Sequence, residues 1–457
     1  MKMILKNTLL VMLIILSIYQ TAMLWFDYPS DRNFFYSIID DDSSLIVDES
    51  VMNYELFYPE EVAVYEGTQG TYQKKKLNEN DDFTLVSDGI LLIQTSFNIG
   101  VPLEGAIFAK QLWENPHLLF KMPYTITEEI LVNNLSVEST WIKPDMNIDY
   151  IYVYPADFTD NYVTVYFADE SLTTKFGCKI PLDQSKQLNA SLKRYLEEAD
   201  DTEDLVYFSA KKSMLPIFLN ERLLPNKDQT YDLLENLYGD IYFYEGEKRD
   251  SQQIKNFVDY FFLNPENIWK IENPEEVRYG DSEAIVSYDS KGLFRYELLE
   301  ELTGKKVNLN KAYETYKIFL GKDTTLSQIE YRLSEYKVFE EEIVFYFDYY
   351  HRGVPIIFDS IEQDYGIETP MVLTVRGNTV VEYQRLLWRS QEVVIQGNQF
   401  EVEFQKPIDD LLSDYPDTDI KIADMYLAYH ISDLVDGAYL QWVVELDNGK
   451  RGFYELE

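Results

Sequence analysis

Cysteine is almost absent from this sequence, which contains Cys178 alone. A single cysteine cannot form an internal disulfide, so the fold must be held together by its hydrophobic cores. We expect Cys178 to be a small core residue. Histidine is also rare, and His117, His351 and His430 lie far apart in the chain. None has a metal-ligand neighbour four residues on or lies in an H-E-x-x-H motif, so we expect all three to be structural.

Complete catalytic motifs are missing as well. Residues 280–284 lack the second glycine of a nucleophile elbow. Residues 209–212 fit S-x-x-K and residues 96–98 fit S-x-N, but the order is reversed and K-T-G is absent. A calcium loop starting at Asn78 has Phe83 where glycine is required. No glycine-rich phosphate loop occurs, and a glycosidase pair cannot be chosen among 80 acidic residues. The sequence therefore predicts no catalytic, metal-binding or cofactor-binding residue and no enzyme.

Basic charge is scarce relative to acidic charge. The chain has 40 Lys and Arg residues against 80 Asp and Glu residues, with a net charge of −40 and a pI of about 4.3. Nucleic acid binding requires a basic surface, so nucleic acid is excluded as an expected partner. The same charge disfavours tight docking on anionic lipid or an anionic wall polymer. We interpret the acidity as a source of solubility in an ionic exterior.

A long hydrophobic run is present, in contrast, near the N-terminus. Residues 7–26 are twenty residues without a formal charge, long enough as a helix to span about 30 Å of bilayer. Lys2 and Lys6 precede the run and Asp27 follows it, which predicts a cytoplasmic N-terminus and export of the rest. A cleaved signal peptide is the alternative, but Gln20 lies two residues before Ala22 and breaks an A-x-A site. A buried core helix is a further alternative, but a core helix of this length would normally carry a polar stripe.

One face of this predicted transmembrane helix carries its polar side chains. Ser17, Gln20, Thr21 and Leu24 follow the spacing i, i+3, i+4 and i+7. Ser17 and Thr21 form a small-xxx-small pair that allows another helix to approach closely, and Gln20 can hydrogen-bond across such an interface. We therefore predict that this face docks on a partner helix. The alternative is that Gln20 snorkels to the outer interface, because Trp25 is five residues away.

The remaining sequence predicts an α+β fold rich in strands. Aromatic residues make up 15% of the chain, which favours strands. Alternation and turn residues predict strands at 61–65, 89–93, 149–154, 162–167, 284–288, 293–296, 342–349, 354–358, 371–375, 380–383, 424–432 and 438–446. Helical spacing of apolar residues predicts helices at 184–198, 252–262, 309–319 and 408–412.

A repeat of hairpin, helix and hairpin follows residue 274. Its two copies are about 85 residues each, which predicts a duplicated α+β domain; two unrelated sheet domains are the alternative. The predicted organisation is one transmembrane helix and a multidomain extracytoplasmic part. Its segments are a cytoplasmic N-terminus and anchor (1–26), a juxtamembrane segment (27–45), an N-terminal α+β domain (46–274) and two similar repeats of mixed sheet and helix (275–360 and 361–457).

The order of several short motifs resembles the YycH family of bacterial membrane-anchored regulators. The motifs are the anchor ending at Trp25, FFLNPENI at 261–268, YGD at 279–281, GLFRY at 292–296, YHRGVPI at 350–356, the stretch 377–387 with YQRLL, and the closing strand pair with Trp442. The likeness runs nearly the full length and is least clear over residues 45–145.

This resemblance implies one transmembrane helix and three extracytoplasmic domains, of which the last two are alike. It also implies a function, namely control of the WalK sensor kinase of cell-wall homeostasis together with the sister protein YycI, through contacts of transmembrane helices and exported domains. It carries over no enzymatic residues. The alternative function is that of a membrane-tethered, extracytoplasmic wall-polymer-binding protein or wall hydrolase.

Overall fold

The computed structural model describes most of residues 59–456. The gaps are residues 66–70, 76–81, 104–111, 114, 135–136, 138–145, 157–160, 174, 199–205, 211, 214, 226–229, 233–235, 242–243, 246–247, 250, 263, 300–307, 359–360, 392–398, 402, 416–419 and 433–437. The chain separates into two units, residues 1–50 and 51–457, and all described residues belong to the second. The predicted anchor and juxtamembrane segment therefore lie outside the described residues.

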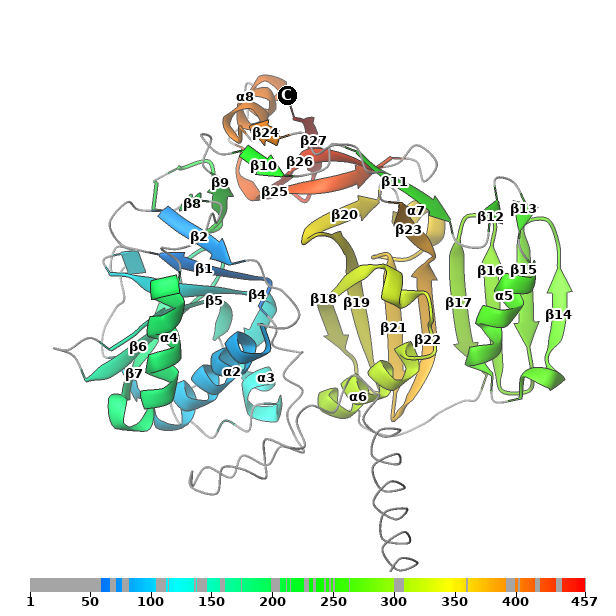
Figure 1. The fold of residues 1–457 in the computed structure, drawn as a ribbon, viewed down its shortest axis with the longest axis horizontal. Coiled ribbons are helices and arrows are strands. Elements are labelled where there is room, and N and C mark those ends of the chain that lie inside the picture. Colours follow the sequence, from blue (N-terminus) through cyan, green and yellow to red (C-terminus); the bar gives the residue numbers. More distant parts are fainter. Residues whose placement is uncertain are drawn as a thin grey trace, which may run out of the picture. The chain divides into compact units, whose positions relative to one another are not determined.

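An antiparallel sheet of nine strands is built from residues 61–225 (Figure 1). Its strands, in spatial order, are β3 (Val101–Pro102), β7 (Lys175–Pro181), β6 (Tyr162–Ala168), β5 (Asn147–Tyr154), β4 (His117–Thr127), β1 (Glu61–Tyr65), β2 (Thr71–Lys75), β8 (Val206–Ser209) and β9 (Leu223–Pro225). The strand predicted at 61–65 is confirmed as β1. The pair predicted at 149–154 and 162–167 is also confirmed, because β5 pairs with β6 from Tyr150 to Tyr154.

Helices α2 (Asp82–Ile99) and α4 (Lys186–Glu198) lie against the nine-stranded sheet, and α3 (Glu128–Asn134) follows β4 (Figure 1). Leu188 and Leu192 of α4 are buried at the predicted helical spacing, so the helix predicted at 184–198 is confirmed. The strand predicted at 89–93 is wrong, because these residues belong to α2. A short apolar run fits a buried strand and a buried helix equally well. Buried Ile93 and Phe97, four residues apart, follow the helical period.

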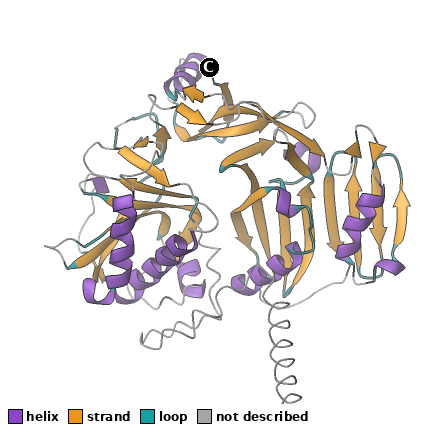
Figure 2. Cartoon of the chain, in the orientation of Figure 1, coloured by secondary structure: helices purple, strands orange, loops and turns teal. Residues whose placement is uncertain are grey.

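A second sheet joins fourteen strands of the remaining chain (Figure 2). In spatial order they are β14 (Trp269–Glu272), β15 (Glu276–Gly280), β16 (Ala284–Asp289), β17 (Leu293–Leu298), β22 (Thr379–Leu386), β21 (Met371–Arg376), β19 (Glu342–His351), β20 (Val354–Phe358), β25 (Ile422–Ile431), β26 (Ala438–Leu446), β11 (Asn236–Ile241) and β23 (Trp388–Gln391); β18 (Glu330–Val338) pairs with β19, and β27 (Arg451–Glu455) pairs with β26. The strands predicted after residue 280 are all present. Two small pairs complete the described strands, β10 (Thr230–Asp232) with β24 (Gln399–Glu401) and β12 (Tyr244–Glu245) with β13 (Lys248–Arg249).

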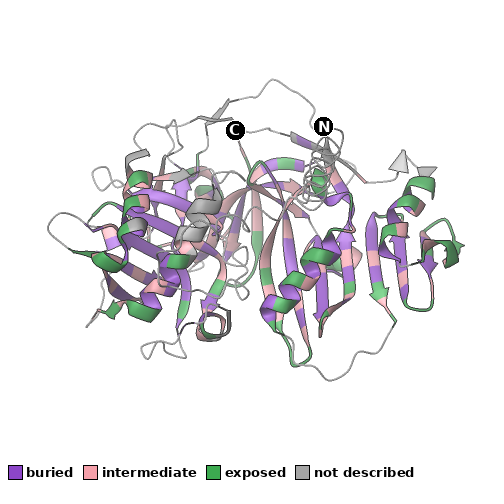
Figure 3. Ribbon diagram, turned by 60° about the horizontal axis from the view of Figure 1, so that its bottom comes forward, coloured by how far each residue is buried: buried purple, intermediate pink, exposed green. Residues whose placement is uncertain are grey.

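Three of the predicted helices accompany this second sheet and are confirmed. They are α5 (Ser251–Val258, continued by a 3-10 turn at Asp259–Phe261), α6 (Leu309–Leu320) and α8 (Gln405–Asp414), and a short helix α7 (Ile361–Tyr365) lies between β20 and β21. Asn308 caps α6, because its side chain accepts hydrogen bonds from the N–H groups of Asn310 and Lys311. Figure 3 shows that buried residues concentrate in the strands and on the helix sides facing them.

Strand pairing crosses the predicted limits of the repeats. β17, from the first predicted repeat, pairs with β22 from the second, and β11 and β14 lie before residue 274 but pair with strands after it. The order of a hairpin, a helix and further strands recurs as β16–β17, α6, β18–β19 and as β21–β22, α8, β25–β26. The predicted domain limits stay a prediction.

The described chain is therefore an α+β protein in which two large, mainly antiparallel sheets carry a small number of helices. Within the described part of the chain, no helix combines the length and the apolar character needed to cross a bilayer.

Candidate functional site

A short segment before β9 links the two large sheets. Ile422, the first residue of β25, donates its N–H to the carbonyl of Ile217 at 2.8 Å and accepts the N–H of Leu219 at 2.8 Å. Phe218 forms a parallel bridge with Ile422 and is buried in a hydrophobic cluster with Leu411 of α8 and Trp442 of β26. Five residues after Phe218, at Leu223, β9 begins and joins the nine-stranded sheet by pairing with β8. Residues 217–225 thus connect the two sheets, with hydrogen bonds to β25 at their start and strand β9 at their end, and we call them the linking segment.

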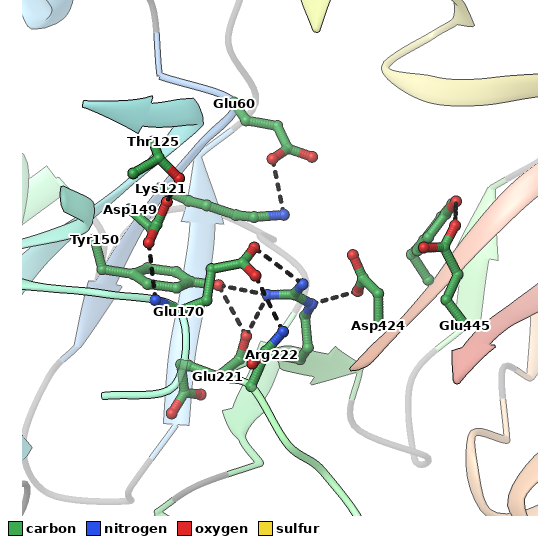
Figure 4. Close-up of polar contacts among 12 residues, drawn as sticks. Glu60, Lys121, Thr125, Asp149, Tyr150, Glu170, Glu221, Arg222, Asp424 and Glu445 are labelled. Carbon is green, nitrogen blue, oxygen red and sulfur yellow. Dashed lines mark hydrogen bonds and ion pairs between the residues drawn. The ribbon is translucent and has the colours of Figure 1, made fainter. Parts of the chain in front are cut away.

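Arg222 is the basic residue of this linking segment, and its guanidinium is almost fully buried (Figure 4). Its Nε donates to Oδ1 of Asp424 in β25. Its Nη1 donates to the Tyr150 hydroxyl at 3.0 Å and to the backbone carbonyl of Glu221 at 2.7 Å. Its Nη2 lies 3.3 Å from Oε1 of Glu170. One cation therefore connects strand β5, the turn after β6, the linking segment and β25.

A second group of polar contacts supports Glu170. Its Oε2 accepts a hydrogen bond from Asn220 at 3.0 Å, and its backbone N–H donates to Asp149 Oδ2 at 3.0 Å. Asp149 also accepts the Thr125 hydroxyl at 2.6 Å. Figure 4 shows Lys121 beside this group, with its ammonium 2.8 Å from Oε2 of Glu60. The carboxylates at the site thus accept hydrogen bonds from within the protein.

Burial and charge oppose each other at these carboxylates. Burial alone would raise the pKa of Asp424, but Arg222 and Lys121 outweigh it and hold that pKa below its usual value. Burial raises the pKa of Asp149, since the Thr125 hydrogen bond only partly offsets the loss of water. Asp424 is therefore held as an anion by its cations. An anion committed in this way acts as a structural contact rather than as a proton donor.

A second buried ion pair lies inside the fourteen-stranded sheet, in the YQRLL motif. Arg385 of β22 is fully buried and its Nη1 lies 2.5 Å from Oδ2 of Asp323. Arg385 Nη1 also donates to the Thr325 hydroxyl at 2.8 Å, and Nε donates to the Tyr349 hydroxyl at 2.9 Å. The Tyr383 hydroxyl donates to Asp323 Oδ2 at 2.8 Å. This motif residue thus ties the loop after α6 to β19 and β22.

The other residues considered in the sequence have structural positions. Cys178 is buried in the core, as predicted, and burial raises the pKa of its thiol to about 12. His430 stacks on Phe453 with ring centroids 3.7 Å apart. The Ser209 hydroxyl donates to Glu221 at 2.9 Å, whereas the Lys212 ammonium contacts the Tyr65 hydroxyl. The side chains of Ser209 and Lys212, the serine and lysine of the S-x-x-K match, therefore have different hydrogen-bond partners.

Two further expectations concern the partner face of the anchor and metal-binding residues. The predicted partner face of Ser17, Gln20, Thr21 and Leu24 lies outside the described residues. Within the described residues, no three His, Cys, Asp or Glu side chains are grouped so that they could hold a metal ion. Arg222 and Asp424 were not singled out from the sequence, because they are 202 positions apart and match no motif.

His117 lies in a cluster of tyrosines at the start of β4. Its Nε2 is 3.1 Å from the Tyr72 hydroxyl and its Nδ1 is 2.9 Å from the backbone carbonyl of Asn115. The carbonyl can only accept, so Nδ1 carries the proton and Nε2 accepts from Tyr72. Rings of Tyr65 and Tyr154 lie 4.8 Å from the imidazole. Burial lowers the pKa of His117 to about 3, so the imidazole is neutral at neutral pH.

We expect His117 to make the protein less stable in acid. In the unfolded chain its pKa is about 6.5, so unfolding takes up a proton below that pH, and the contribution shrinks by about 2 kcal/mol between pH 7 and pH 5. Replacing His117 with Gln, which keeps a donor and an acceptor, should remove this loss. Urea unfolding of both proteins at pH 7 and pH 5 measures the difference.

Asp348 changes the stability with pH in the opposite direction to His117. The effect of His117 must therefore be measured as a difference between the wild type and His117→Gln. Burial raises the pKa of Asp348 to about 6, so its contribution to stability is largest at low pH and is lost as the pH rises through 6. The wild-type slope alone therefore mixes the two groups. An equal pH dependence in wild type and His117→Gln would contradict the assignment of a neutral, buried imidazole.

The fold and these buried polar contacts define a multi-sheet α+β protein whose charged residues join its sheets. Its fold is similar to that of the crystal structure of YycH from Bacillus subtilis, with a TM-score of 0.50, 14% sequence identity, and coverage of 88% of this chain and 96% of that one. An uncharacterised protein from Eubacterium rectale matches 49% of this chain with a TM-score of 0.32, and the C-terminal domain of YpeB from Bacillus megaterium matches 46% with a TM-score of 0.27. No protein-family model matches the sequence, and no curated protein matches it either.

Proposed function

We propose that this protein is a membrane-anchored, non-enzymatic regulator of a WalK-like sensor histidine kinase that controls cell-wall homeostasis. It acts by protein–protein contact, together with a YycI-like sister protein. The observation that carries the proposal is the near full-length likeness to YycH, which extends over 88% of this chain and 96% of the other. The motif order leads independently to the same family, from the anchor at residues 7–26 to the strand pair with Trp442.

The buried polar clusters support a function by contact. The Asp424 and Glu170 carboxylates contact Arg222, and the Ser209 hydroxyl donates to Glu221. A nucleophile needs an adjacent base and access to substrate, whereas Ser209 is buried and paired with a carboxylate in a structural contact. These residues hold the linking segment in place, which suits a protein that presents a defined surface to a partner.

In the proposed topology, residues 7–26 span the cell membrane once, with the N-terminus in the cytoplasm and the rest of the chain outside. Protease added to intact protoplasts should then remove the exported part, and protection of that part would contradict this topology.

The function itself is tested by purifying the full-length protein from membranes and identifying the proteins that accompany it. Recovery of a sensor histidine kinase supports the proposal. Turnover of wall fragments by the purified protein, without recovery of a kinase, would favour a wall hydrolase instead.

The predicted partner face of the anchor allows a sharper test. Replacing Ser17, Gln20 and Thr21 together with Leu should reduce cross-linking of the anchor to a kinase or sister-protein helix and should change kinase-dependent transcription. The reason is that leucine both blocks close helix approach and removes the interhelical hydrogen bond, which is worth about 0.6 kcal/mol on average. A matched variant changed at Ile15, Ile18 and Ala22, on the opposite face, is the control. Sensitivity of the control alone would assign contact to that opposite face.

A further inference from the structure

Strand β14 forms one end of the fourteen-stranded sheet. It pairs with β15 on one side, and it is the terminal strand in the order of the described strands. All four of its residues, Trp269, Lys270, Ile271 and Glu272, are exposed. Ile271 is 59% exposed and Trp269 is 40% exposed, on the same face of the strand. An apolar terminal strand of this kind is a template for pairing with another chain.

Trp269 is held in position by the neighbouring strand. A side-chain carbon added to Gly280 of β15 would lie 2.3 Å from the indole Cζ2, so the indole lies directly over the glycine backbone. Lys270 and Glu272 lie on the other face, with Nζ and Oε2 2.6 Å apart. The strand therefore presents an ordered apolar face and an ordered charged face at the end of the sheet.

Hydrogen bonding within the hairpin shows which backbone groups of β14 point outward. The N–H of Asn273 donates to the carbonyl of Glu276 at 2.9 Å, so Asn273 faces β15. Because the backbone groups of successive residues alternate between the two edges of a strand, Ile271 and Trp269 also face β15. The backbone groups of Lys270 and Glu272 then point away from β15, toward any strand that joins this edge.

Only one antiparallel register suits pairing of β14 with an identical strand. Residues whose backbone groups point outward must lie opposite each other, which leaves three registers. One register places Lys270 opposite Lys270 of the other copy, and like charges directly opposite are destabilising. Another register places Glu272 opposite Glu272, which is destabilising for the same reason, and it also places Lys270 opposite Pro274, which has no N–H. In the third, Lys270 faces Glu272 twice, and Ile271 faces its own copy.

We propose that β14 is a dimerisation edge, on which a second copy of this chain pairs antiparallel about Ile271 and continues the sheet. The symmetric charges of Lys270 and Glu272 specify the register, and Ile271 forms the central contact. Ile271 is then in a non-hydrogen-bonded pair, with Cα atoms about 4.5 Å apart. This inference does not depend on the proposed function, because it concerns the purified protein alone.

Cysteine cross-linking of the full-length chain tests the central contact. Two cysteines at position 271 would have a Cα separation within the range of disulfides, so Ile271→Cys should form a disulfide-linked dimer under mild oxidation. The native Cys178 is buried and should not contribute. Ile318→Cys is the control, since Ile318 on α6 is 77% exposed but lies in another element. A dimer of the 271 variant alone supports the proposal. Failure to cross-link, equal cross-linking of both variants, or linkage to a different protein overturns it.

A charge exchange tests the register. Lys270→Glu alone and Glu272→Lys alone place like charges opposite each other, and each should weaken dimerisation by about tenfold or more. The double variant Lys270→Glu/Glu272→Lys should restore it, because opposite charges face each other again. Sedimentation measures the association, and circular dichroism checks that these exposed changes leave the fold intact. Unchanged association in the single variants, or no recovery in the double variant, would rule out the proposed register.

Discussion

Replacing Arg385 with Met is expected to lower the free energy of unfolding by about 3–5 kcal/mol. Arg385 and Asp323 are both fully buried, and the substitution leaves the Asp323 carboxylate without its cation. It also removes the donor to the Tyr349 hydroxyl. An uncompensated buried charge is far more costly than a lost surface contact. The midpoint of urea unfolding, followed by tryptophan fluorescence, measures the loss.

Arg376 provides the matched control for this prediction. It is an arginine on the adjacent strand β21, with its Nη2 2.6 Å from Oε2 of Glu342, and both side chains are partly exposed. Exposed pairs contribute about 0–1 kcal/mol, so Arg376→Met should change stability little. If Arg385→Met were as stable as Arg376→Met, the buried pair would not support this sheet.

Replacing Arg222 with Met is expected to loosen the linking segment and to destabilise the protein by about 3 kcal/mol at neutral pH. The variant loses the contacts to Asp424, Glu170 and Tyr150 together. Amide exchange should accelerate at Leu219 and Ile422, whose 2.8 Å hydrogen bonds attach the segment to β25. Hydrogen exchange with urea unfolding therefore gives a local and a global measurement of the same change.

The stability difference between the wild type and Arg222→Met should depend on pH. In the wild type, burial alone would raise the pKa of Asp424, but Arg222 and Lys121 hold it below its usual value. This carboxylate therefore stabilises the fold above about pH 4, and the stabilisation is lost as the pH falls through the lowered pKa. The difference between wild type and Arg222→Met should therefore shrink in acid. Arg278→Met is the control, because Arg278 is mostly exposed beside Glu276. A constant difference from pH 7 to pH 3 would show that Asp424 is not the group stabilised by Arg222.

Local pattern predicted most of the strands and helices. The strands at 284–288 and 293–296 have apolar alternation around the turn at Lys291 and Gly292, and they form the hairpin β16–β17. The helix predicted at 309–319 has apolar residues on one face, and it forms α6. Such elements are predictable because alternation and turn chemistry act over a few residues.

Two elements show where local pattern fails. Residues 89–93 are a continuous apolar run that fits a strand, but they belong to helix α2, which buries Leu92 and Ile93 in the core. Strand β18 carries charged residues among half-buried ones and so lacks a clear alternation, yet it pairs with β19 along its length. In both cases the neighbouring elements in the tertiary structure decide whether the residues form a helix or a strand, because the same residues can be buried in more than one way.

The sequence by itself determined the acidic charge, the absence of disulfides, the uncharged run at 7–26, the strand-rich α+β class and the motif order that resembles YycH. These properties depend on composition and on neighbouring residues. Only the tertiary structure decided that Arg222 meets Asp424, that Arg385 meets Asp323 and that β14 ends a sheet. Such contacts join residues far apart in the chain, and a lone arginine or a short strand has the same local sequence whether it is solvated, buried against a carboxylate or left at an edge.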